Sequence, residues 1–180
     1  KKPRSNRLQV SPQDPIRIRT VRLTTLKTSI HLSRSNGYRE LGMFDESILI
    51  LEAIDGNDRW HPLVVEARYN TYRDAKEWEL AKIMAYFMYE RYPESFEWCK
   101  NLVDARTECG DPTGALQMLK GVVIKFGELA DYVYSVARQY ALLGEIEDAK
   151  RFVKRAIKRD ASVKKKFLDD PAFDAVWDSF

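Results

Sequence analysis

The sequence predicts an all-α fold built from repeated pairs of antiparallel helices. Three observations lead to this expectation. Glycine (8 residues) and proline (7 residues) are sparse in a chain of 180 residues, whereas the strong helix formers are common. A short motif occurs four times at equal intervals, since its copies end at positions 47, 81, 115 and 149. This interval, the repeat period, is the signature of a chain assembled from repeated structural units.

The motif joins a turn signal to a small residue that follows five positions later. Its four copies are LGMFDES (41–47), AKEWELA (75–81), CGDPTGA (109–115) and LGEIEDA (143–149). The turn position holds Gly42, Gly110 and Gly144, and glycine ends a helix at little cost because it readily adopts a left-handed conformation. Lys76 holds this position in the second copy, where a side chain should cost some stability.

The small residues that close the motif are Ser47, Ala81, Ala115 and Ala149. Apolar residues follow each of them at helical spacing, so each motif joins two helices of about 12–14 residues. We expect the small residue to lie where the two helices cross closely, since a larger side chain there would push them apart.

The period divides the chain into segments, which are taken in order. Residues 1–27 form a basic arm, expected to be extended, with eight basic residues against one acidic residue. The four repeats follow, at 28–61, 62–95, 96–129 and 130–163. Residues 164–180 are expected to cap the last repeat, with the lysines at 164–166 facing solvent. The capping residues should be Phe167, Leu168, Phe173, Val176, Trp177 and Phe180.

A helix–turn–helix repeat of about 34 residues with columns of small and aliphatic residues resembles the tetratricopeptide repeat. The fourth unit matches the family best, through Tyr140, Leu143, Gly144, Ala149 and Ala156. Arg34 and Arg68 depart from the family, because they stand where it usually has leucine. The pentatricopeptide repeat, an RNA-reading module, is the nearest alternative, but its usual period is one residue longer.

The resemblance implies a right-handed superhelical solenoid whose first helices line a concave groove for partner proteins. Asparagine side chains of family members bind the backbone of an extended peptide in this groove, since the amide both donates and accepts hydrogen bonds. The alternative interpretation is that these are ordinary polar residues on an exposed helix face. The family's groove positions correspond here to Asn36, Arg39, Asn70, Arg73, Lys100, Asn101, Asp104, Tyr134 and Arg138.

The sequence contains no pattern of residues that indicates catalysis or a cofactor. His31 and His61 are the only histidines, and with two dispersed cysteines they provide no zinc-site spacing. Cys99 and Cys109 would lie about 15 Å apart on one helix, too far to form a disulfide, so both are expected to be buried free thiols. We therefore expect a non-enzymatic chain with no metal and no cofactor.

The expected function is a protein-interaction scaffold. The groove positions and their neighbours carry a mild acidic excess, which favours a basic or mixed-charge partner segment. The chain's own arm has this character, so self-association through residues 1–27 is a further hypothesis. The alternative is nucleic-acid binding through the arm. The sequence disfavours it, because the net charge of +3 falls to −4 once the arm, at +7, is set aside.

The expected location is the cytoplasm, because no apolar run is long enough to span a membrane and free thiols favour a reducing compartment. The chain begins with Lys rather than Met, so we expect a fragment or a processed chain.

Overall fold

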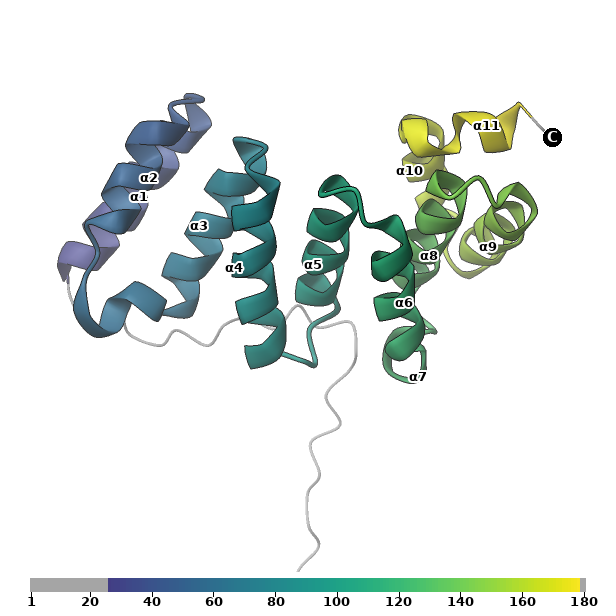
Figure 1. The fold of residues 1–180 in the computed structure, drawn as a ribbon, viewed down its shortest axis with the longest axis horizontal. Coiled ribbons are helices and arrows are strands. Elements are labelled where there is room, and N and C mark those ends of the chain that lie inside the picture. Colours follow the sequence, from purple (N-terminus) through teal and green to yellow (C-terminus); the bar gives the residue numbers. More distant parts are fainter. Residues whose placement is uncertain (1–25, 179–180) are drawn as a thin grey trace, which may run out of the picture.

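The computed structural model describes residues 26–178, and within this range the secondary structure is entirely helical (Figure 1). Most of the predicted basic arm and the predicted capping residue Phe180 lie outside the described residues. The expectation of an all-α fold is confirmed for the part of the chain that is described.

Four antiparallel helix pairs lie side by side, followed by three short helices at the C-terminal end (Figure 1). The pairs are α1 (Leu26–Glu40) with α2 (Phe44–Glu52), α3 (Pro62–Asp74) with α4 (Trp78–Arg91), α5 (Phe96–Glu108) with α6 (Pro112–Gly121), and α8 (Ala130–Leu142) with α9 (Ile146–Arg159). The remaining elements are η1 (Gly56–Trp60), α7 (Val123–Phe126), α10 (Val163–Asp169), η2 (Pro171–Phe173) and α11 (Asp174–Trp177). From one pair to the next, the end of the first helix and the start of the second both shift by the repeat period.

The same type of hydrogen-bonded turn connects the two helices of every pair. Its left-handed position is occupied by Gly42 (φ 74°), Lys76 (φ 61°), Gly110 (φ 84°) and Gly144 (φ 74°). The next residue donates its N–H to a carbonyl five positions earlier, as from Glu145 to Tyr140 at 2.9 Å. This pattern satisfies carbonyls that the end of the first helix would otherwise leave unpaired. Lys76 adopts the conformation predicted to be costly for a residue with a side chain.

The small residue that follows each turn is completely buried in all four pairs, as Ser47, Ala81, Ala115 and Ala149 have no exposed surface. Ser47 differs from the alanines because its hydroxyl lies 2.8 Å from that of Ser35 on α1 and 3.1 Å from that of Thr71 on α3. A small side chain at this position therefore lets the neighbouring helices approach, and in the first pair a hydroxyl also links them.

Helix α2 has 9 residues, fewer than the 12–14 predicted, and Arg68 packs against its end. The Arg68 side chain is 3% exposed and donates to the carbonyls of Leu51 (3.0 Å) and Arg59 (2.8 Å). Its Nε also lies 3.2 Å from a carboxylate oxygen of Glu52. The guanidinium thus ties the end of α2 to η1 and to α3.

Helix α6 is also shorter than predicted, with 10 residues, and the short α7 follows it. The break falls at Gly121 and two valines. Glycine and β-branched residues have low helix propensity, which favours a break at this point.

The C-terminal segment packs against α8 and α9. Phe167, Phe173 and Val176 have no exposed surface, and the Trp177 indole donates to the carbonyl of Phe167 at 3.2 Å. The lysines at 164–166 are exposed, as expected. The prediction for Leu168 was wrong, because this side chain is 59% exposed. It directly follows Phe167 on α10, so the helix turns it away from the core.

Candidate functional site

The predicted groove residues line two hollows formed by the first helices of the pairs. The first hollow, of about 260 Å³, lies between α1 and α3 and includes Asn36, Arg39 and Asn70. The second, of about 330 Å³, is formed mainly by α3, α5 and α8. It is lined by the other six predicted residues, namely Arg73, Lys100, Asn101, Asp104, Tyr134 and Arg138.

Asp74 links the two hollows, because it accepts hydrogen bonds from an arginine of each. Arg39 reaches it at 2.5 Å, and Arg73 reaches its other carboxylate oxygen at 2.8 Å. Burial on its own raises the pKa of Asp74, but the bonds from Arg73 and Arg39 outweigh this and lower the pKa below its usual value. Both arginines are therefore held by one ionised carboxylate of the chain itself.

The asparagines differ in how much of their hydrogen-bonding capacity is used. Asn36 donates to Glu40 at 2.7 Å and accepts from Arg39 at 2.8 Å. Asn70 and Asn101 are partly exposed, and within residues 26–178 neither side chain makes a hydrogen bond. Each of these two amides therefore has two donors and an acceptor free at the wall of a hollow.

Asp170 of the C-terminal segment reaches the second hollow, which sequence reasoning missed. Its carboxylate accepts from the Tyr134 hydroxyl at 2.6 Å and from Arg138 Nε at 3.2 Å. Burial, and then the hydrogen bond to Asp170, raises the pKa of Tyr134. Arg138 also pairs with Glu108 at 3.3 Å. Two of the predicted groove residues are thus already occupied by the chain's own acids.

Two aromatic residues of the second hollow were also missed. Tyr69 lines it from α3, and Trp78 lines it from the start of α4. The Arg73 guanidinium lies 5.7 Å from the centre of the Tyr69 ring, within cation–π range. Burial, followed by the charge of Asp104, raises the pKa of Tyr69 to about 12. The columns of polar residues spaced by the repeat period did not point to either ring.

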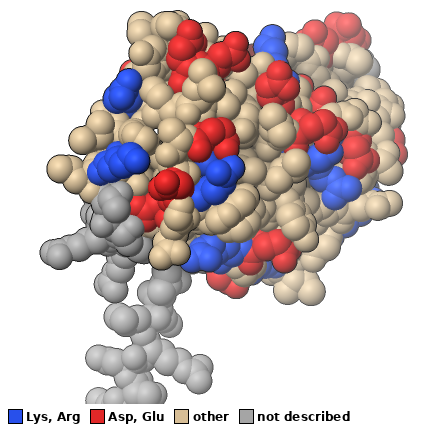
Figure 2. Space-filling view, turned by 60° about the vertical axis from the view of Figure 1, so that its left-hand side comes forward, with Lys and Arg blue, Asp and Glu red and all other residues tan. Residues whose placement is uncertain are grey.

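Charges of both signs surround the hollows. Figure 2 shows acidic and basic side chains interspersed on the face that it presents. In the hollows, Lys100 pairs with Asp104 on the same helix, and the three arginines pair as described above. Glu66 lines the first hollow with no ion pair among the described residues. Its burial, and then the neighbouring Glu97, raise the pKa of Glu66.

In the described part of the chain, no three His, Cys, Asp or Glu side chains gather closely enough to hold a metal ion. No helix among residues 26–178 has the length and apolar character needed to cross a membrane.

The comparisons with known proteins find similar chains among solved structures. No family model and no curated protein matches the chain. Among solved structures, one described as "MamA MSR-1 C2" is similar at 15% sequence identity and a TM-score of 0.47. The match covers 77% of this chain and 99% of that chain. A likeness at this TM-score is too low to carry a family or a function over to the present chain.

Proposed function

We propose that this chain is a non-enzymatic protein-interaction module that binds a partner segment along the first helices of its pairs. One observation carries the proposal: the nine residues that the family resemblance selects line two hollows joined through Asp74. In this proposal the units are 28–61, 62–95, 96–129 and 130–163 of a right-handed solenoid that resembles tetratricopeptide repeats, and residues 164–180 cap it.

Asn70 and Asn101 are the proposed contacts to the backbone of the partner. Their amides are free within the described residues, and one lines each hollow. A primary amide can pair with both the N–H and the C=O of an extended peptide, whatever its sequence. Such contacts would hold a segment in place, while neighbouring charges select its side chains.

The partner segment should be basic or mixed in charge. The basic residues of the two hollows are already paired with acids of the chain, so an acidic segment would have to displace these acids. Glu66 instead carries an uncompensated carboxylate whose raised pKa reports the cost of its ionisation. A lysine or arginine of the partner would offset this cost. Residues 1–27 of the chain itself have suitable charge, so self-association is part of the same hypothesis.

The proposal is tested with the double variant Asn70→Ala/Asn101→Ala. The partner is captured from a lysate with the tagged chain, identified, purified and titrated calorimetrically. Hydrogen bonds of this kind contribute about 0.5–1.5 kcal/mol each, so losing several should weaken binding by about tenfold or more. The control is Glu90→Ala/Gln117→Ala, two exposed residues on the second helices. Equal affinities of the two double variants would contradict the proposal.

A further inference from the structure

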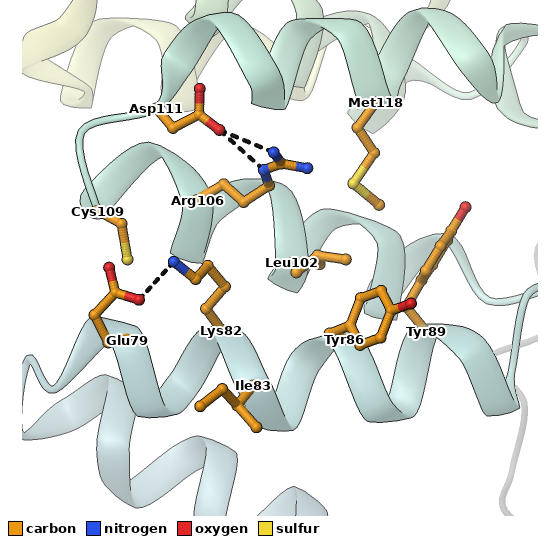
Figure 3. Close-up of a pocket in the computed structure, with 10 residues that line it drawn as sticks. All are labelled: Glu79, Lys82, Ile83, Tyr86, Tyr89, Leu102, Arg106, Cys109, Asp111 and Met118. Carbon is orange, nitrogen blue, oxygen red and sulfur yellow. Dashed lines mark hydrogen bonds and ion pairs between the residues drawn. The ribbon is translucent and has the colours of Figure 1, made fainter.

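A third hollow, with a volume of about 510 Å³, lies away from the two groove hollows. Figure 3 shows α4 on one side of it, α6 on the other and α5 behind. Its apolar lining comes from Ile83, Tyr86 and Tyr89 on α4, Leu102 on α5 and Met118 on α6. A volume of this size is typical of small-molecule sites, which are usually apolar clefts with a few polar groups.

The fourth helix pair shows why the hollow is open. A shift by one repeat period relates Arg106, Cys109 and Met118 of its lining to Tyr140, Leu143 and Phe152. The rings of Tyr140 and Phe152 stack with their centres 5.4 Å apart. The third pair has no aromatic ring at either of these two positions. The chain therefore fills this space with two of its own rings in one unit and leaves it open in the preceding one.

Cys109 belongs to the same opening, and it corrects the expectation that both thiols are buried. Cys99 is completely buried, whereas Cys109 is partly exposed and lines the hollow. Burial, and then the neighbouring Glu79, raises the pKa of Cys109. The thiol therefore stays protonated at neutral pH and adds a small, weakly polar surface to the lining.

The charged residues of the lining are paired with one another. Lys82 Nζ lies 2.5 Å from Glu79 Oε2, and Arg106 Nη2 lies 2.9 Å from Asp111 Oδ2, as the dashed lines in Figure 3 mark. A hydrogen bond from the Gly114 backbone N–H is the largest influence that lowers the pKa of Asp111, and Arg106 adds to it. The four charges sum to zero and complement an uncharged ligand better than an ion.

We propose that this hollow binds a small uncharged aromatic molecule of one or two rings. The tyrosine rings can pack against such a ligand edge to face or offset, and the Met118 sulfur favours a ring edge. The Arg106 guanidinium offers a cation–π contact. The charged side chains at the rim already bond to each other, so they have little hydrogen-bonding capacity left for the backbone of a partner protein. The site is independent of the proposed groove, because it shares no lining residue with either groove hollow.

The test uses N-phenyl-1-naphthylamine, an uncharged aromatic probe that fluoresces in apolar surroundings, titrated into the full chain. We expect a saturable increase in fluorescence. The closing variant, Arg106→Tyr/Met118→Phe, gives the third unit the ring pair that the fourth unit has, and these rings should fill the hollow. It should therefore weaken probe binding at least tenfold and raise Tm. The proposal is overturned if the probe gives no saturable signal with the unmodified chain. It is also overturned if the double variant folds and binds the probe as tightly as the unmodified chain does.

A second variant decides the matter even if the closing variant misfolds. Ile83 is 54% exposed, and Ile83→Gln should weaken probe binding without unfolding the chain. Leu49 is its counterpart one repeat period earlier, on α2, and is 70% exposed, so Leu49→Gln is the matched control. Equal effects of the two substitutions would show that the probe binds exposed apolar surface generally, which contradicts a site in this hollow.

Discussion

The N-terminal and C-terminal halves of the molecule share the spacing of their helices, but the first pair is held together differently from the last. Around the first pair, Leu51, Ile54 and Val64 form a small apolar cluster. Beside it lie the linked hydroxyls of Ser35, Ser47 and Thr71 and the buried Arg68. The third and fourth pairs and the C-terminal segment instead share one large apolar core that contains Phe167 and Phe173.

The difference shows which features of the repeat are demanding. Both halves keep the left-handed turn and the buried small residue. The other core positions vary widely: the position of Arg68 holds Leu102 and Val136 in the next two units, and all three side chains are buried. Backbone direction is thus set by the turn and by close helix contact, while the filling of the core adapts to either polar or apolar side chains.

The largest expected effect contrasts the two ends of the molecule. Phe167→Ala removes a completely buried ring, so the free energy of unfolding should fall by about 3–5 kcal/mol. Ile30→Ala should cost less than about 0.5 kcal/mol, because Ile30 is 50% exposed, whereas its counterparts Val64, Trp98 and Tyr132 are buried. Denaturant unfolding of both variants checks the contrast. Similar losses would mean that the first pair is covered as fully as the last.

The small-residue position can be tested within the C-terminal half. Ala149 has no exposed surface, so Ala149→Leu should overpack the core and lower the free energy of unfolding by about 1–3 kcal/mol. Ala149→Ser, the residue that the first pair uses, is the control and should cost much less, because it adds only one atom. If thermal unfolding shows that leucine is accommodated as well as serine, the helices do not need a small residue there.

The turns offer a reciprocal exchange between the halves. Lys76→Gly removes a side chain from a left-handed conformation and should stabilise the protein by about 1 kcal/mol. Gly144→Lys places one there and should destabilise by a similar amount, with open space around the new Cβ excluding a steric clash as the cause. Calorimetric Tm values of both variants should therefore move in opposite directions. A shift of the same sign in both would contradict a common turn conformation.

The smallest expected effect concerns Glu66, whose raised pKa means that the folded chain disfavours the ionised carboxylate. This cost is absent below the unfolded pKa of about 4.3 and grows as pH rises through the folded pKa. Glu66→Gln should therefore stabilise at pH 7, by about 0.5 kcal/mol or less because the group is partly solvated, and the gain should vanish in acid. Denaturation curves of the variant and the unmodified chain, at pH 7 and in acid below the unfolded pKa, check the sign of the change in stability. A gain that persists in acid would indicate a packing effect.

Much of the helical framework could be predicted from the sequence, because the signals that set it are local. The turn at Gly144 and the cost at Lys76 follow from backbone sterics alone. The role of Arg68 could not be predicted, because it depends on carbonyls from two other elements, at Leu51 and Arg59, that meet only in the fold. Its appearance in place of an expected leucine was the available signal.

The candidate site was less predictable than the helices, because its contacts also join elements that meet only in the fold. The groove positions taken from the family resemblance gave nine of the residues that line the two hollows, but neither Tyr69 nor Trp78. They also did not show that Asp170 would reach Tyr134 and Arg138 from more than thirty residues away. A hint lay in the acid that precedes Pro171, although its direction depends on how the segment folds back. The hollow beside α5 also left a trace in the sequence, as Arg106 interrupts a column of tyrosines at positions 38, 72 and 140.

Asp170 has a consequence for the energetics of the whole C-terminal end. Its carboxylate holds the turn before η2 by accepting from the Ala172 N–H at 3.0 Å and also bonds to Tyr134 and Arg138 of α8. A ligand group that takes these two side chains must displace Asp170 and loosen the C-terminal segment. Thermodynamic linkage is reciprocal, so substitutions that loosen this segment should strengthen binding of such a ligand group at the second hollow. The gain should be at most the docking free energy that the substitution removes.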